Sequence, residues 1–117
     1  MNKRQKGTAW EKQAATYLAE RGMRIAETNF RCRQGEIDLV GYHEDCLVFV
    51  EVKYRRTTRQ GHALEAVNYN KQKKICRVAD YYRYVHKVGQ NVSIRYDVVG
   101  IQDGEIQWVK NAFMHIY

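Results

Sequence analysis

The 117-residue sequence contains no proline and three cysteines, and no apolar run approaches the roughly 18 residues of a membrane-spanning helix. Cys32, Cys46 and Cys76 form no Cys-x-x-Cys pair, which indicates neither a zinc site nor a redox site. We expect free thiols in a reducing compartment. Residues 1–7 also lack the apolar stretch of a secretory signal. We therefore expect a cytoplasmic protein that has no membrane partner.

The eight glycines are scattered along the chain and form no glycine-rich phosphate loop, so nucleotide hydrolysis has no support. The four histidines share no metal-ligand spacing, and the chain has no repeats. A chain of 117 residues with 44% hydrophobic content is large enough for one core and too small for two ordinary domains. We predict a single domain over residues 1–117, with residues 1–6 as a flexible basic N-terminus.

Basic residues outnumber acidic ones by 20 to 13, which gives a formal net charge of +7. This balance favours a polyanionic partner, and nucleic acid is the first candidate. A positive total is weak support by itself, because many basic proteins bind nothing specific. Local clusters add to it, since they would grip phosphates without reading sequence. The candidates for nucleic-acid contact are Arg33, Arg55, Arg56, Arg59, Lys71, Lys73 and Lys74. A solvated charged surface is the alternative.

Residues 36–42 and 47–54 have the alternating, β-branched and aromatic character of strands. The four polar residues 43–46 between them predict a hairpin. Because successive side chains of a strand alternate between faces, one face of the hairpin should be apolar and should pack against helices. That face would carry Ile37, Leu39, Val48, Val50, Val52 and Tyr54.

The other face of this hairpin would gather four charged side chains. If the turn is symmetric, residues whose numbers sum to 89 face each other, so Asp38 opposes Glu51 and Glu36 opposes Lys53. Opposed carboxylates have Cβ atoms about 5 Å apart and repel by on the order of 3 kcal/mol at an effective dielectric constant near 20. A bound Mg²⁺, which prefers hard oxygen ligands, would remove this repulsion. The alternative is that this face is simply the wet side of a half-buried hairpin.

Three strings of residues, 35–40, 48–55 and 95–99, contain an aspartate, a hairpin and then Glu-x-Lys, and they resemble the bacterial YraN family of the PD-(D/E)XK nuclease superfamily. The match runs from about residue 7 to the end of the chain. The resemblance implies a restriction-endonuclease-like fold and a nuclease akin to Holliday-junction resolvases. Related resolvases place an acidic residue of the first helix at the active site, and Glu11 is the position that matches it.

Thr8 and Glu11 fit a capping box, which predicts a first helix that starts there and runs to about Arg21. An apolar stripe would bury one side of this helix, and Gly22 would end it. Glu11 lies at the edge of the stripe, where its carboxylate could cap the helix, reach the sheet as a metal ligand, or do both. The stripe consists of Trp10, Ala14, Tyr17 and Leu18.

The remaining pattern predicts strands over residues 23–30, 92–101 and 105–109, and a long helix over residues 70–87. The fold class is therefore α/β, with the order α-β-β-β-α-β-β, and its core is a restriction-endonuclease-like mixed sheet flanked by helices. Asp97 is a charged residue within a strand that could lie near Arg95 or serve the site. The apolar tail, residues 110–117, should pack on the core or across a dimer interface.

These patterns favour a Mg²⁺-dependent endonuclease for DNA, with Mn²⁺ as a substitute metal. It would select structure rather than sequence, because no segment resembles a base-reading motif. Asp38 and Glu51 would bind the metal, Lys53 would position the attacking water, Glu36 would tune Lys53, and Glu11 would complete the site. Junction cleavage would favour a homodimer. A nucleic-acid-binding module without turnover and an RNA-processing nuclease are the alternatives.

Overall fold

The computed structural model describes residues 3–56 and 67–117, with side chains from residue 9 onward. Its elements are α1 (Lys3–Glu20), β1 (Arg24–Cys32), β2 (Gly35–His43), β3 (Cys46–Arg55), α2 (Tyr69–Val85), β4 (Ser93–Gln102) and β5 (Glu105–Phe113). One sheet has the strand order β1-β2-β3-β4-β5, in which β3 and β4 are parallel and the other neighbours are antiparallel. The predicted α/β class and element order are confirmed. The predicted loop at residues 57–62 and the basic residue Arg59 lie outside the described residues.

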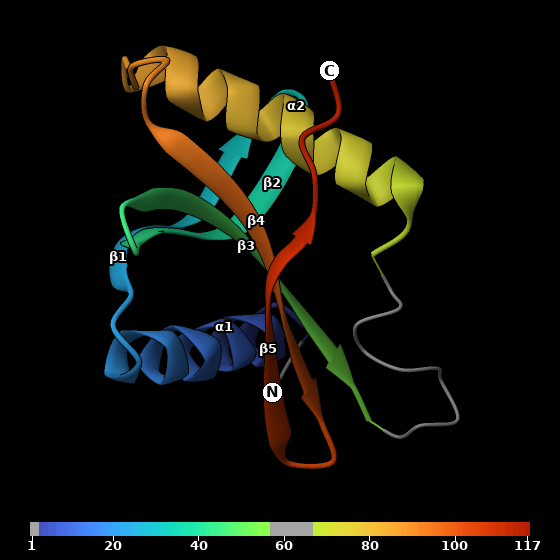
Figure 1. Cartoon of the computed structure of the whole chain (residues 1–117). Coiled ribbons are helices and arrows are strands. Elements are labelled where there is room, and N and C mark those ends of the chain that lie inside the picture. Colours follow the sequence, from blue (N-terminus) through green and yellow to red (C-terminus); the bar gives the residue numbers. More distant parts are fainter. Residues whose placement is uncertain (1–2, 57–66) are drawn as a thin grey trace.

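Each face of the sheet is covered by one helix, α1 on one side and α2 on the other (Figure 1). The first cluster joins Ala14 and Leu18 of α1 to Leu39, Val48 and other residues of the strands. A second cluster packs α2 against the opposite face of the sheet. The helices thus pack chiefly against β1, β2 and β3, and the charged residues of the hairpin lie where a helix meets the sheet.

Helix α1 begins at Lys3, so the capping box predicted at Thr8 does not start it. Residues 3–6, which we expected in a flexible N-terminus, form its first turn. The predicted end is confirmed: Gly22 has a positive φ of 100°, and the N–H of Met23 bonds the carbonyl of Leu18 at 3.0 Å, as in a Schellman motif. The buried stripe is also confirmed, since Ala14 and Leu18 are fully buried.

The β2–β3 hairpin has the predicted register. Its pairs run from Leu39↔Val50 to His43↔Cys46, and every pair sums to 89. The turn consists of Glu44 and Asp45, whose φ values of 50° and 64° are both positive, as a two-residue type I′ turn requires.

The predicted apolar face is wrong at one residue. Leu39, Val48 and Val50 pack in the cluster with α1, whereas Ile37 packs in the cluster with α2. Val40 also packs with α2, so strict alternation does not hold between Ile37 and Val40. Asp38 lies inside this irregular stretch, just beyond the last pair of the ladder. The local change in the strand gives the Asp38 carboxylate a direction that simple alternation does not predict.

The C-terminal tail packs on the core through Phe113 and Ile116, which confirms one of the two expectations for it, whereas Met114 and Tyr117 are exposed. Strand β5 extends to Phe113, beyond the predicted residue 109, because it pairs with β4 along that length. The guanidinium of Arg77 on α2 then donates to the carbonyl of Ile116, and the N–H of Ile116 donates to Cys76 Sγ at 3.4 Å. No helix in the described part of the chain combines the length and apolar character needed to cross a membrane.

Candidate active site

Three carboxylates from two elements meet beside the end of the β2–β3 ladder. Glu11 comes from α1, and Glu36 and Asp38 come from β2; one oxygen from each lies within 4.8 Å of the others. The buried stripe of α1 docks on the sheet, and this packing directs the edge residue Glu11 toward β2. The sequence placed Glu11 on that edge, and the structure brings it to Asp38.

Asp38 is the most perturbed of these groups. Its Oδ2 accepts a hydrogen bond from the backbone N–H of Val52 at 2.7 Å. The pKa of Asp38 is raised to about 8: burial is the largest cause, the charges of Glu51, Glu11 and Glu36 add to it, and the hydrogen bond from Val52 opposes it. A carboxyl group in this setting binds a proton or a cation much more strongly than one in water does.

Burial, with a smaller contribution from the charge of Glu36, also raises the pKa of Glu11. Hydrogen bonds with Asn29 and Asp38 oppose that rise. Asn29 belongs to β1 and has a positive φ of 53°, a conformation that asparagine tolerates better than most residues. Asn29 was not among the residues predicted for the site. An asparagine within a predicted strand was the one available signal.

Glu51 is 5% exposed and lies close to this group without joining it. Its Oε1 lies 3.2 Å from Lys53 Nζ and 3.6 Å from Lys71 Nζ. The register put Asp38 and Glu51 at opposing positions, but the carboxylates that gather around Asp38 are Glu11 and Glu36. Glu51 acts on Asp38 through its charge, as the second largest cause of the raised pKa.

The predicted pairing of Glu36 with Lys53 is wrong. Glu36 lies opposite Arg31 in the β1–β2 ladder, and Glu36 Oε2 accepts a hydrogen bond from Arg31 Nε at 2.7 Å. Lys53 instead contacts Glu51, two residues away on the same strand. The reason is that the β2–β3 ladder ends at Leu39↔Val50, before it reaches Glu36, whereas the β1–β2 ladder pairs Glu36 with Arg31.

Oxygen atoms at the site suit a hard cation. Glu11 Oε2 and Glu51 Oε2 are both buried and have no hydrogen-bond partner among the described residues. A buried carboxylate oxygen without a partner is costly, and a bound cation can satisfy such an oxygen. Mg²⁺ and Mn²⁺ favour carboxylate ligands, so this set of donors fits the metal that the sequence predicted.

The described residues among the predicted basic set lie in three places: at Glu51, after β1 and at the end of β3, and along α2. Lys71 turns to Glu51 at the acidic site. Arg33 in the turn after β1 and Arg56 after β3 are exposed, and Arg55 at the end of β3 is half-buried. Lys73 and Lys74 are exposed on α2, where with Asn70 and Arg77 they line a pocket of about 340 Å³. The acidic site and the basic pocket thus share the first half of α2.

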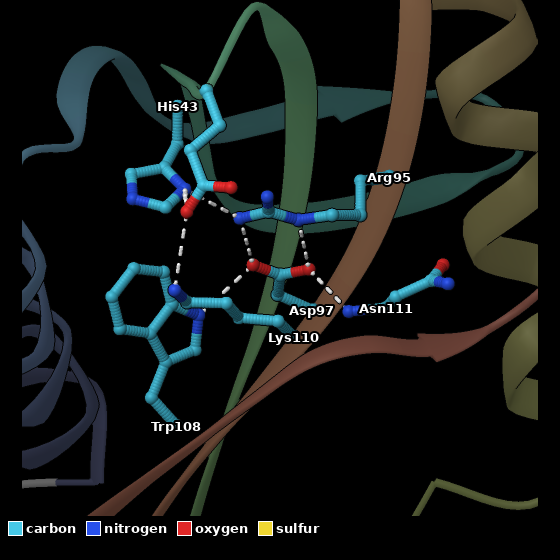
Figure 2. Close-up of polar contacts among 7 residues, drawn as sticks. His43, Arg95, Asp97, Trp108, Lys110 and Asn111 are labelled. Atoms are coloured by element: carbon cyan, nitrogen blue, oxygen red, sulfur yellow. Dashed lines mark hydrogen bonds and ion pairs between the residues drawn. The ribbon is translucent and has the colours of Figure 1, made fainter.

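Asp97 lies in a separate buried network, shown in Figure 2. Its two oxygens accept four hydrogen bonds: two from Arg95, one from the indole N–H of Trp108 and one from the backbone N–H of Asn111. Arg95 Nη2, which donates to Asp97 Oδ2, also lies 3.0 Å from His43 Nδ1. Because Asp97 has so many partners, it serves the packing of β4 and β5 and offers no oxygen to a metal. Of the two expectations for Asp97, the one near Arg95 is confirmed.

A mixed five-stranded sheet with a helix on each face and an acidic cluster beside the β2–β3 hairpin defines an α/β protein, and within residues 9–56 and 67–117 this cluster is the candidate metal site. The sequence model of "Uncharacterised protein family UPF0102" matches residues 10–101. The chain belongs to this family, which confirms the resemblance to the YraN family.

Bacterial relatives carry the same family name. A UPF0102 protein of Lachnoclostridium phytofermentans is 44% identical over 113 residues, which cover 97% of this chain and 96% of the relative. A UPF0102 protein of Photobacterium profundum is 41% identical over 117 residues, covering 97% and 94% of the two chains. A third, from Clostridioides difficile, is 40% identical over 115 residues, covering 97% of this chain and all of the relative. The similarity spans the residues of the candidate site.

Proposed function

We propose that this protein is a metal-dependent endonuclease that hydrolyses DNA phosphodiester bonds. The observation that carries the proposal is the convergence of Glu11, Glu36 and Asp38 within 4.8 Å. The pKa of Asp38 is raised to about 8, first by burial and next by the charge of Glu51, and the charges of Glu11 and Glu36 add smaller contributions. A fold that keeps so many carboxylates together gains from a divalent cation that neutralises them.

Each residue of the site would have a role that follows from its position. Asp38 and Glu11 of the cluster, together with Glu51, which lies close to the cluster on β3, would hold Mg²⁺ or Mn²⁺, which when bound lowers the pKa of water and offsets charge on the phosphate. Lys53, whose side chain is 25% exposed, would orient the attacking water and stabilise charge on the phosphate. Glu36, held by Arg31, would add negative charge beside Asp38 and so strengthen its hold on the cation.

DNA would be held by exposed and half-buried basic residues. Arg33 follows β1, Arg55 ends β3 and Arg56 follows it, and Lys73 and Lys74 lie along α2. Contacts of this kind grip the phosphate backbone and give little sequence discrimination. The substrate class would therefore be a shape, such as branched or junction DNA, and a homodimer would place two sites on one junction.

The test is cleavage of four-way junctions, flaps, plain duplex and single-stranded RNA in the presence of Mg²⁺ or Mn²⁺. We expect metal-dependent cutting of branched DNA that Asp38→Ala and Glu51→Ala each abolish. Asp103→Ala and Glu105→Ala are the matched controls, since both remove an exposed carboxylate at the β4–β5 turn. If Asp38→Ala cuts as well as the wild type, the proposal is wrong. Cutting of RNA alone would keep the site and change the substrate.

One observation favours a second candidate, a nucleic-acid-binding module on a nuclease scaffold. Glu51 already has two lysines at its Oε1, so this carboxylate is compensated without a cation. In that case the basic residues would bind nucleic acid, with strong dependence on salt, and no substrate would be cut. Binding of branched DNA by the wild type with no cleavage at any metal concentration would support the module.

A further inference from the structure

We infer that Lys71 is a positioning residue of the proposed active site, where it serves as a second counter-ion of Glu51, and that it does not belong to the surface that would grip DNA. This inference rests on the proposed function. Lys71 Nζ lies 3.6 Å from Glu51 Oε1, the same oxygen that Lys53 Nζ approaches to 3.2 Å. Its neighbours Lys73 and Lys74 are exposed and line the pocket on α2 instead.

The backbone of α2 fixes where Lys71 lies. Asn68 is the N-cap of the helix, and its Oδ1 accepts a hydrogen bond from the N–H of Lys71 at 2.9 Å. The side-chain amide of Gln72 also donates to the carbonyl of Val67 at 3.1 Å, which ties the first turn of α2 to the residue before its N-cap. Lys71 is therefore placed over the sheet by a well-defined helix start.

A lysine in the first turn of a helix is electrostatically unfavourable, because the N-terminus of the helix macrodipole is positive. The first turn of α2 contains no acidic residue that would offset the charge of Lys71. The compensating anion comes from outside the helix, and it is the buried carboxylate of Glu51 on β3. The contact thus joins α2 to β3, the strand that precedes it in the order of elements.

Because two lysines contact one carboxylate oxygen, Lys53 can move away from Glu51 without leaving it unpaired. To reach a phosphate or a water, Lys53 must leave Glu51, and a buried carboxylate that loses its counter-ion is strongly destabilised. Lys71 comes from a different element and can remain on Glu51 while Lys53 moves. Lys71 also competes with a cation for Glu51, so it should weaken metal binding while it supports turnover.

The experiment compares Lys71→Met, Lys71→Arg and, as the matched control, Lys73→Met. For Lys71→Met we expect Mn²⁺ to bind about tenfold more tightly in calorimetric titration, since one competing charge near the cation is gone. Cleavage should show a kcat about tenfold lower with KM for DNA unchanged, because Lys53 then stays with Glu51. Lys71→Arg should restore most of the kcat. Lys73→Met should leave Mn²⁺ affinity unchanged and flatten the salt dependence of DNA binding.

The inference is overturned if Lys71→Met leaves Mn²⁺ affinity unchanged and flattens the salt dependence as Lys73→Met does. A wild type that neither binds Mn²⁺ nor cuts would instead refute the proposed function. The pairing can still be decided in that case by a thermal-unfolding double-mutant cycle of Lys71→Met with Glu51→Gln. Coupling between the two changes supports the counter-ion role, and additive effects overturn it.

Discussion

The backbone N–H of Val52 donates to Asp38 Oδ2 at 2.7 Å, just beyond Leu39↔Val50, the last pair of the β2–β3 ladder. A side-chain carboxylate thus takes the place that a backbone carbonyl would hold in a continued ladder. The hydrogen bond fixes the direction of the carboxylate and keeps it next to Glu11 and Glu36. The site is therefore built into the sheet and does not depend on a loop for its central residue.

Asp38 should make stability depend on pH. Its folded-state pKa of about 8 lies above its ordinary value of 3.8, so the folded state binds the proton more tightly than the unfolded chain does. The stability that this proton confers is complete below about pH 4 and is lost as the pH rises toward 8. Asp38→Asn mimics the protonated form and can still accept the Val52 hydrogen bond.

Urea unfolding without divalent metal should therefore show little difference between wild type and Asp38→Asn at pH 4, and a more stable Asp38→Asn at pH 8. The expected gap at pH 8 is roughly a few kcal/mol. Asp103→Asn, at the exposed β4–β5 turn, is the control and should follow the wild type at both values. A constant gap between pH 4 and pH 8 would contradict the raised pKa.

Glu11 should contribute to metal binding. Glu11→Gln keeps the size of the side chain and removes one negative charge from the group around Asp38, so Mn²⁺ affinity should fall by about tenfold. Calorimetric titration measures this directly. Glu20→Gln removes an exposed charge from the other end of α1 and should leave the affinity unchanged. Equal affinities for the two variants would remove Glu11 from the site.

Lys73 and Lys74 should set the salt dependence of DNA binding. Each phosphate contact contributes about 0.9 to the slope of log affinity against log salt, so Lys73→Gln with Lys74→Gln should flatten the slope by roughly 1.8. Fluorescence anisotropy over a salt series gives the slope. The control pair is Lys12→Gln with Lys87→Gln, two exposed lysines on α1 and after α2. If both double variants have the wild-type slope, α2 does not bind the DNA backbone.

Asp97 should matter for stability and not for metal binding. Asp97→Asn would leave the Arg95 guanidinium buried without its carboxylate and should lower the free energy of unfolding by about 3–5 kcal/mol. Mn²⁺ affinity, measured below the unfolding transition, should be unchanged. Asp103→Asn is again the matched exposed control. A normal unfolding free energy would show that the network around Asp97 is dispensable.

The order of elements and the hairpin register could be predicted because both depend on neighbours in the sequence. A two-residue turn at Glu44 and Asp45 fixes which residues of β2 and β3 oppose each other. The apolar stripe of α1 likewise fixes which side of the helix is buried, and it placed Glu11 at the edge of that side. The predicted start of α1 was wrong, because a plausible cap at Thr8 does not stop a helix from extending to earlier residues.

Only the tertiary structure decided which charges meet. The hairpin register by itself predicted that Glu36 faces Lys53, but the sheet places Arg31 of β1 beside Glu36. The sequence suggested that Lys71 binds DNA, but in the structure Lys71 contacts Glu51. This contact forms because α2 packs over β3 and the N-cap of α2 fixes the position of its first turn. Local pattern determines strands, helices and faces, whereas the partner of a charged side chain depends on which elements the fold brings together.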